Sequence, residues 1–147
     1  MKSELLIFLN LQYYCLKTIK VKKITSEILR DFIAQNPIEL KSTHSKLCLP
    51  IINRLYRKMS IGIKFSNIKV ANSLIIDGHH RYIASLLAKS NLNKVKSNLT
   101  SAIEIIDWSL VDFVEEDWDT QAKINMFNEI DAKFNEIPLE KIIELLK

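Results

Sequence analysis

The scarcity of glycine is the feature that most restricts what this chain can build. The 147 residues contain only two glycines, Gly62 and Gly78, where an average composition of about 7% would give roughly ten. Neither the GxGxxG dinucleotide fingerprint nor the GxxxxGKS/T phosphate loop can be written with two glycines so far apart. Any phosphate site must therefore be built in another way.

Length and composition predict one globular domain. The 48% hydrophobic and 26% charged fractions are ordinary for such a domain. Cys15 and Cys48 lack CxxC spacing, which predicts reduced cysteines and no zinc site. The apolar residues 5–16 contain Asn10 and Gln12 and are too short to span a bilayer, so we predict a strand or helix that packs on the domain. We expect a cytoplasmic protein without a membrane partner.

Charge is distributed unevenly along the chain. Residues 1–100 carry 17 Lys and Arg against 5 Asp and Glu, a net of +12, and residues 101–147 carry 4 against 12, a net of −8. A basic body with an acidic end indicates that the body handles an anion, with phosphate or nucleic acid as the usual candidates. The alternative is that lysine-rich faces are merely solvated. The acidic run at residues 112–119 is a solvated surface, a cover for the basic region or a site for a basic partner.

The first half of the chain predicts a strand at residues 19–24 and a helix capped by Thr25 or Ser26 that reaches Gln35. Residues 39–49 are predicted to be a polar loop. Pro50 begins a helix with apolar residues at helical spacing and basic residues at its other positions. Gly62 ends this helix in the left-handed conformation. The apolar and the basic positions of that helix are Ile51, Ile52, Leu55 and Met59, and Arg54, Arg57 and Lys58.

The second half predicts two short strands, residues 68–70 and 74–76, followed by a helix over residues 82–88. Val95 and residues 103–106 are candidates for further strands. Thr120 caps a helix in which Ile124, Phe127, Ile130 and Phe134 share one face, and Pro138 opens a last amphipathic helix.

The sequence Asp77-Gly78-His79-His80-Arg81 connects the second of these strands to its helix. Backbone N–H groups at a helix start, together with the helix dipole, bind a phosphate without a glycine-rich loop. Gly78 allows close approach or positive φ, Arg81 and the imidazoles add charged donors, and Asp77 can hold magnesium or accept a proton. The alternative is structural: Asp77 is an N-cap, and the histidines satisfy local backbone groups.

Residues 74–84 resemble the signature of the ParB/sulfiredoxin superfamily, which includes ParB-like nuclease domains and free serine kinases. Members share a strand, a helix ending in glycine, an apolar strand pair and a Gly-x-His/Arg-Arg turn that opens a helix. This chain has that order over residues 19–106. The resemblance implies an α/β (α+β) domain over residues 1–106, with a short mixed sheet and an N-terminal extension at 1–18. An acidic helical C-terminal extension, residues 107–147, packs on it.

The resemblance also implies which residues form the site. A nucleotide or nucleic-acid phosphate is expected against Gly78, His79, His80 and Arg81. The basic helix then faces the same pocket with Arg54, Arg57 and Lys58. Asp77, His80 and His44 are the expected catalytic residues, and Asp77 is also the expected ligand of Mg²⁺ that accompanies ATP, ADP or CTP.

The family's activities need residues that this chain has only in part. Sulfiredoxins carry a cysteine immediately before the His-Arg pair, where this chain has His79. Free serine kinases carry a Pro-His-Glu loop, and here the comparable residues are Thr43-His44-Ser45, with Ser45 replacing the glutamate. Glu39 or Asp77 is an alternative base. Partition ParB proteins bind CTP through Gly-Glu-Arg-Arg and continue into a DNA reader, whereas this chain continues into an acidic region.

Three functions therefore follow as expectations. The first is a nucleotide- or phosphate-binding protein, a magnesium-dependent phosphotransferase or NTPase in which Arg81, Lys58 and His80 stabilise charge. The second is a nuclease or nucleic-acid-binding module that uses the same site. The third is a non-enzymatic immunity or regulatory protein that binds a protein partner through its acidic C-terminal region.

Overall fold

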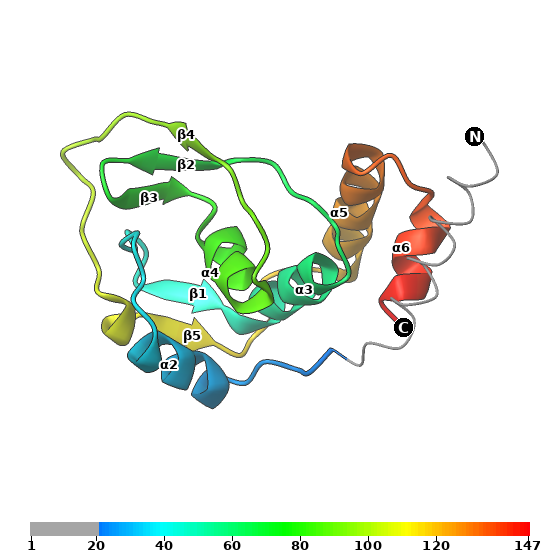
Figure 1. The fold of residues 1–147 in the computed structure, drawn as a ribbon, viewed down its shortest axis with the longest axis horizontal. Helices are drawn as coiled ribbons and strands as arrows, with labels where there is room; N and C mark the ends of the chain where they lie inside the picture. The colour runs from blue at the N-terminus through cyan, green and yellow to red at the C-terminus, as the bar shows by residue number, and fades with distance from the viewer. Residues whose placement is uncertain (1–20) are drawn as a thin grey trace.

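The computed structural model describes residues 21–147, which form a small mixed α/β domain of the α+β class (Figure 1). The predicted segment 5–16 and the first two residues of the predicted strand at 19–24 lie outside the described residues. The elements are α2 (Ser26–Gln35), β1 (Lys46–Cys48), α3 (Leu49–Ser60), β2 (Ile68–Ala71), β3 (Leu74–Asp77), α4 (His79–Ala88), β4 (Lys94–Lys96), the 3-10 helix η1 (Trp108–Leu110), β5 (Asp112–Val114), α5 (Gln121–Phe134) and α6 (Leu139–Leu145).

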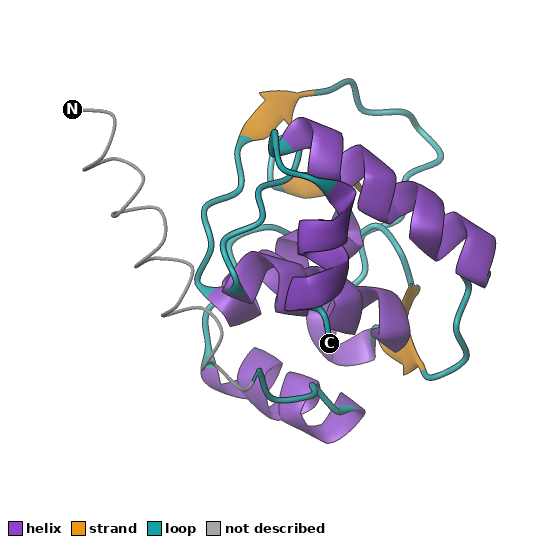
Figure 2. Cartoon of the chain, turned by 90° about the vertical axis from the view of Figure 1, so that its right-hand side faces the viewer, coloured by secondary structure: helices purple, strands orange, loops and turns teal. Residues whose placement is uncertain are grey.

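The strands form two small sheets on either side of helix α4. One sheet has the order β3-β2-β4, with an antiparallel β2–β3 hairpin and a parallel β2–β4 pair. The other is a parallel pair of β1 and β5. Helix α4 lies between the two sheets and packs along α3 (Figure 1), and the side view shows the strands at opposite sides of the central helices (Figure 2). The three-stranded sheet is therefore mixed, as predicted.

The main core lies around helices α3 and α4. In α4 the side chains of Tyr82, Ile83 and Ala84 are buried. The Tyr82 hydroxyl accepts a hydrogen bond from the backbone N–H of Leu40 at 3.2 Å. The buried members of this cluster that other elements contribute include Leu29, Leu47, Ile52, Ile68, Ile75, Trp108, Val111 and Phe113.

Helix boundaries follow the caps that the sequence predicted. The Thr25 hydroxyl accepts from the Ile28 N–H at 3.2 Å at the start of α2, and Thr120 accepts from the Lys123 N–H at 3.3 Å at the start of α5. Helix α3 has its proline in the first turn. Its end is a Schellman motif, because the N–H groups of Gly62 and Ile63 donate to the carbonyls of Met59 and Lys58 and Gly62 has a φ of +91°.

Three of the strand and loop predictions are wrong. Residues 21–24 form no strand, since the Asn53 side-chain amide bonds both the N–H and the carbonyl of Ile24 at 2.8 and 2.7 Å. Within the predicted loop at 39–49, residues 46–48 form β1 because they pair with β5, far along the chain. Residues 103–106 provide a single bridge, between Ile106 and Ser42, instead of a strand.

The C-terminal residues divide between the main core and a second cluster. Trp108, Val111 and Phe113 belong to the main core. Helices α5 and α6 pack against each other and against the end of α3, around the buried residues Ile61, Ile63, Ala132 and Ile142. No helix within residues 21–147 is long and apolar enough to cross a membrane.

Candidate functional site

The junction between β3 and α4 leaves no room for a side chain at Gly78. This glycine is the N-cap of α4 with a φ of +98°. A Cβ at this position would lie 2.5 Å from Cγ2 of Ile68 on the neighbouring strand. Both reasons for a glycine therefore apply here, the left-handed conformation and the close approach of another element.

His79 is buried at the start of α4, where it binds Thr43 in the loop between α2 and β1. Its Nε2 atom accepts from the Thr43 N–H at 3.2 Å and lies 3.0 Å from the Thr43 hydroxyl, which donates to the Ile75 carbonyl at 2.7 Å. A backbone N–H only donates, so Nε2 carries no proton and the ring is neutral. Burial, and then the charges of His44 and His80, lower the pKa of His79 to about 3.

His80 joins α4 to the start of α3. Its Nε2 accepts from the N–H of Cys48, the N-cap residue of α3, at 2.9 Å, and its ring lies edge-on to Trp118 with centroids 5.7 Å apart. Burial is the largest cause that lowers the pKa of His80 to about 4, with His44 and Arg54 acting in the same direction and Asp119 against it. Both helix histidines therefore accept from backbone N–H groups, but these groups lie 36 and 32 positions away and are not the local ones that the structural alternative predicted.

His44 is exposed beside these two rings. It stacks on His79 with ring centroids 3.8 Å apart and planes 12° from parallel. Ser42 fixes its backbone, because the Ser42 hydroxyl accepts from the His44 N–H at 3.1 Å and donates to the His44 carbonyl at 2.8 Å. His44 is thus the imidazole of this group that solvent and a ligand can reach, and Ser45 beside it is exposed too.

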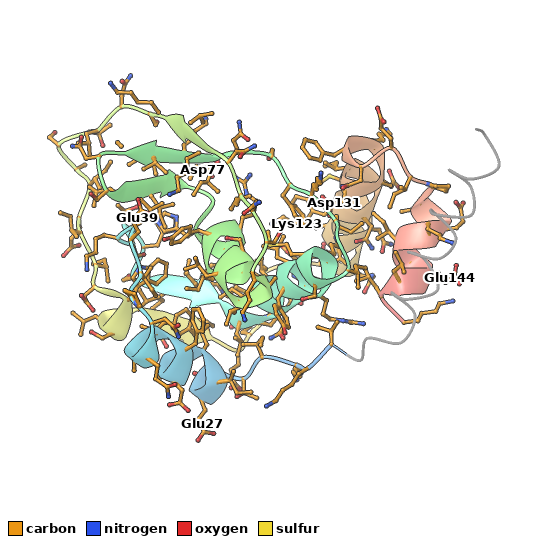
Figure 3. All side chains as sticks on the ribbon, in the orientation of Figure 1. Glu27, Glu39, Asp77, Lys123, Asp131 and Glu144 are labelled. Atoms are coloured by element: carbon orange, nitrogen blue, oxygen red, sulfur yellow. The ribbon has the colours of Figure 1, made fainter. Side chains whose placement is uncertain are left out.

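Asp77, at the end of β3, forms an ion pair with Arg81, four positions later in α4. Arg81 Nη2 lies 3.2 Å from Asp77 Oδ2, with the aspartate side chain 60% exposed and the arginine side chain 19% exposed. Arg81 Nη1 also donates to the carbonyls of Ser66 and Asn67 and to the Ser66 hydroxyl, at 2.8 to 3.1 Å. Arg81 therefore ties the loop before β2 to the start of α4, and the exposed Asp77 is the last residue of the hairpin strand β3 (Figure 3).

The three basic residues of α3 lie in contact with the C-terminal part of the chain. Arg54 binds Asp117 through two nitrogens at 2.6 and 3.0 Å and Asp119 at 2.8 Å. Lys58 binds Asp131 on α5 at 2.6 Å, with the two side chains 5% and 11% exposed. Arg57 donates to the Leu146 carbonyl after α6. Arg54 lies beside His80, whereas Arg57 and Lys58 contact α6 and α5.

Residues 117–119 form an acidic strap across the junction of α3 and α4. Hydrogen bonds from Arg54 lower the pKa of Asp117. Burial raises the pKa of Asp119, but its bonds with Lys123 at 2.7 Å and with Arg54 outweigh this, so its pKa is also lowered. Burial likewise opposes the raised pKa of Arg54, which the two aspartates produce. From the sequence, this contact was only one of the alternatives for residues 112–119, a cover for the basic region. The acidic run and the basic helix each have, taken alone, the pattern of a solvated surface.

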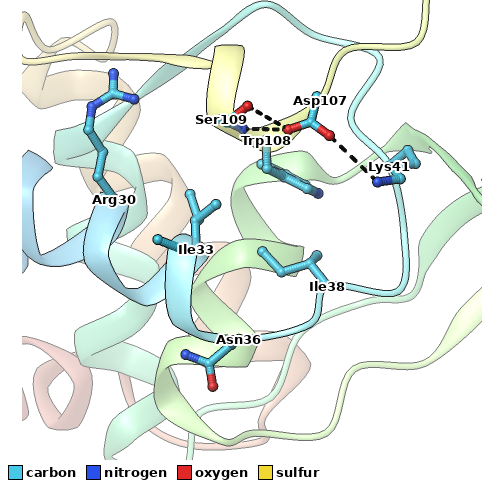
Figure 4. A pocket seen from close by; sticks show the side chains of 9 residues that line it. Arg30, Ile33, Asn36, Ile38, Lys41, Asp107, Trp108 and Ser109 are labelled. Atoms are coloured by element: carbon cyan, nitrogen blue, oxygen red, sulfur yellow. Dashed lines mark hydrogen bonds and ion pairs between the residues drawn. The ribbon is translucent and has the colours of Figure 1, made fainter.

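A groove of about 410 Å³ lies elsewhere, between α2 and η1 (Figure 4). Its walls mix apolar and polar side chains, and the Lys41–Asp107 ion pair of 3.7 Å borders it. None of the predicted site residues lines it. The lining residues are Arg30, Ile33, Ala34, Asn36, Ile38, Lys41, Asp107, Trp108 and Ser109.

Metal ligands are sparse at the β3–α4 junction. Within the described part of the chain, no three His, Cys, Asp or Glu side chains are grouped so as to hold a metal. Mg²⁺ is commonly bound by one or two carboxylates together with waters and substrate phosphates. The exposed Asp77 carboxylate suits that kind of site, in which the ligand's phosphate supplies the other oxygens.

In comparisons with protein-family models, with curated proteins and with solved structures, no match to this chain was found. The assignment to the ParB/sulfiredoxin superfamily therefore stays a prediction from residues 74–84.

Proposed function

We propose that this protein is a ParB/sulfiredoxin-like domain that binds a nucleoside di- or triphosphate with magnesium at the start of α4. The observation that carries the proposal is the β3–α4 junction, where the exposed Asp77, the left-handed Gly78 and the first turn of a helix follow one another. The exposed His44 stands over the same turn. The junction thus combines an exposed carboxylate of the kind that suits Mg²⁺, a helix dipole and a reachable imidazole.

The chemistry at this junction suits an anion with a divalent cation. The first N–H groups of a helix have no carbonyl partner within that helix and carry its positive dipole end. A phosphate placed there gains hydrogen bonds from them, while Asp77 holds Mg²⁺ against the phosphate oxygens. Arg81, fixed by Ser66 and Asn67, adds positive charge without having to be ordered on binding.

Phosphoryl transfer or hydrolysis at this site would depend on the exposed groups. His80 and Lys58 were both expected to stabilise charge. His80 instead accepts a hydrogen bond from the Cys48 N–H, and Lys58 forms an ion pair with Asp131. We therefore assign proton transfer to His44, metal binding to Asp77 and charge stabilisation to Arg81 and the helix start.

Calorimetric titration of ATP, ADP and CTP with and without Mg²⁺ tests the proposal. We expect at least one nucleotide to bind, and Asp77→Asn to remove most of the magnesium-dependent part of the affinity. Asp31→Asn is the matched control, because Asp31 is an exposed aspartate on α2. His44→Gln should leave binding within a few-fold and reduce turnover. Absence of binding to all three nucleotides would refute the proposal.

A nucleic-acid phosphate is the second candidate ligand. The sheet of β2, β3 and β4 carries three exposed lysines, Lys94 and Lys96 on one face and Lys69 on the other, and Lys94 pairs with Glu39 at 3.4 Å. Exposed lysines of this kind favour a polyanion. This alternative predicts affinity for nucleic acid that falls steeply with salt. It also predicts magnesium-dependent nicking of a plasmid that Asp77→Ala abolishes. A plasmid that stays intact in Mg²⁺, Mn²⁺ and Zn²⁺ excludes the nuclease form.

A further inference from the structure

Helix α5 faces the domain with polar residues and solvent with apolar ones. Its buried residues are Asn128, Asp131 and Ala132. Its outer face carries four large apolar side chains with these exposed fractions: Met126 47%, Phe127 39%, Ile130 51% and Phe134 54%. Because residues three and four apart lie on one side of a helix, these four form a continuous stripe, here called the α5 stripe. An amphipathic helix normally has the reverse arrangement.

The orientation of α5 is fixed by polar contacts. Asp131 binds the buried Lys58, and the Asn135 side chain bonds both the N–H and the carbonyl of Lys64, at 2.7 and 2.9 Å. Turning the helix to bury the α5 stripe would break these contacts and leave the Lys58 charge buried without a partner. A contiguous apolar patch held outward in this way indicates that something covers it.

We propose that residues 5–16 of the same chain cover the α5 stripe. Ten of these twelve residues are apolar, the exceptions being Asn10 and Gln12. A segment of this composition needs an apolar surface to pack against, and the α5 stripe supplies one.

The position of Val21, the first described residue, supports this occupant. Val21 packs against the cluster of Ile61, Ile63, Ala132 and Ile142, and Ala132 belongs to α5 itself. Ala132 lies on the buried face of α5, opposite to the α5 stripe, so residues 17–20, which can span about 13 Å, have to pass around a helix about 10 to 12 Å across. Residues 5–16 are therefore tethered within reach of the α5 stripe, which gives them a high effective concentration there compared with any separate partner.

Cross-linking of the full chain through its own Cys15 tests the proposal. Met126→Cys and Ile130→Cys place a thiol on the α5 stripe, and the control Ile105→Cys places one at a 63% exposed site outside α5. Cys48 is buried and does not compete. With a short bismaleimide we expect a cross-link within one chain for both stripe variants, at least fivefold more than for the control.

Cross-links that join two chains only would show that a second copy occupies the stripe and would overturn the proposal. A yield no higher than that of the control would overturn it too, leaving a separate protein or a membrane as the occupant. Hydrogen exchange gives an independent measurement: Ile130→Asp should speed exchange of the amides of residues 5–16 at least tenfold. Leu110→Asp, at a 74% exposed site, should not. Equal exchange in the two variants contradicts the proposal.

Discussion

Helices α3 and α4 pack along each other, but their basic residues have different partners. On α3, Arg54 and Lys58 bind Asp117, Asp119 and Asp131, all more than 60 positions further along the chain. On α4, Arg81 binds groups within about fifteen positions of itself, in the loop before β2 and at the end of β3. The charge of Arg81 is thus satisfied by nearby residues, whereas the charge of α3 is neutralised by the C-terminal region.

This difference changes what the uneven charge of the sequence means. Residues 1–100 have a net charge of +12 and residues 101–147 a net charge of −8. Part of these charges neutralise each other in ion pairs between the two regions, in the contacts of α3 and in the Lys41–Asp107 pair. The net charge of a segment therefore overstates the charge that faces a ligand. At the start of α4 the carboxylate of Asp77 and the ring of His44 stay exposed, which is why we place the ligand there.

The largest effect is expected from the buried ion pair of α3 and α5. Lys58→Met leaves the Asp131 carboxylate buried without its partner and should lower the free energy of unfolding by about 3 to 5 kcal/mol. The double variant Lys58→Met/Asp131→Leu removes both charges and should recover a large part of that loss. Urea denaturation measures both. A loss below about 1 kcal/mol in the single variant would mean that α3 does not depend on α5 for neutralisation.

The two glycines provide a matched pair for the turn at α4. Both have positive φ, but nothing lies within 4 Å of a Cβ at Gly62, and a Cβ at Gly78 would meet Ile68 at 2.5 Å. We expect Gly62→Ala to cost about 1 kcal/mol from backbone strain alone and Gly78→Ala about 1 to 3 kcal/mol more. Equal losses in urea denaturation would show that close packing does not restrict the β3–α4 junction.

Local signals in the sequence were sufficient to predict most helices. Thr25, Thr120, Pro50 and Gly62 mark helix ends, and each does so through contacts within a few residues. The short β1–β5 pair escaped prediction because three-residue strands acquire their identity from a partner about 65 positions away. Contacts of that range leave no periodicity in the sequence.

The residues of the β3–α4 junction could be singled out from the sequence, but not their partners, and Arg57 and Lys58, which were predicted to face the same pocket, contact the C-terminal region instead. The conformation of Gly78 follows from the turn, since a tight turn into a helix favours glycine. That His79 and His80 accept hydrogen bonds from Thr43 and Cys48 depends on where other elements pack. The outward stripe of α5 was hidden for the same reason, because the pattern of Phe127, Ile130 and Phe134 shows a face but not which way it points.

The two histidines of α4 predict a dependence of stability on pH. Their pKa values in the fold, about 3 for His79 and about 4 for His80, lie below the unfolded value of about 6.5. The unfolded chain therefore binds more protons than the folded chain. The contribution of these two histidines to the free energy of unfolding is complete above about pH 6.5 and is lost as the pH falls toward their pKa values in the fold. We expect the urea midpoint to fall between pH 6.5 and 5, above the range in which carboxylates titrate. In His79→Gln/His80→Gln, where the amide oxygen still accepts from the backbone, this slope should flatten, and an unchanged slope would contradict the assignment.

The smallest expected change in stability concerns the acidic strap on Arg54. In the double variant Asp117→Asn/Asp119→Asn, Asp117→Asn weakens a pair whose side chains are 25% and 36% exposed, so the loss of stability should stay near or below about 1 kcal/mol. For Asp119→Asn, at a side chain that is 3% exposed, removing a buried charge offsets part of the lost attraction. The freed guanidinium lies beside His80, next to the proposed phosphate position. Nucleotide affinity should therefore rise several-fold, most clearly at low salt, because screening weakens exposed charges. Glu115→Gln, which removes an exposed acid on the same loop, is the control for net charge. If it raises the affinity as much as the double variant does, the gain comes from overall charge, and the strap does not compete with the ligand.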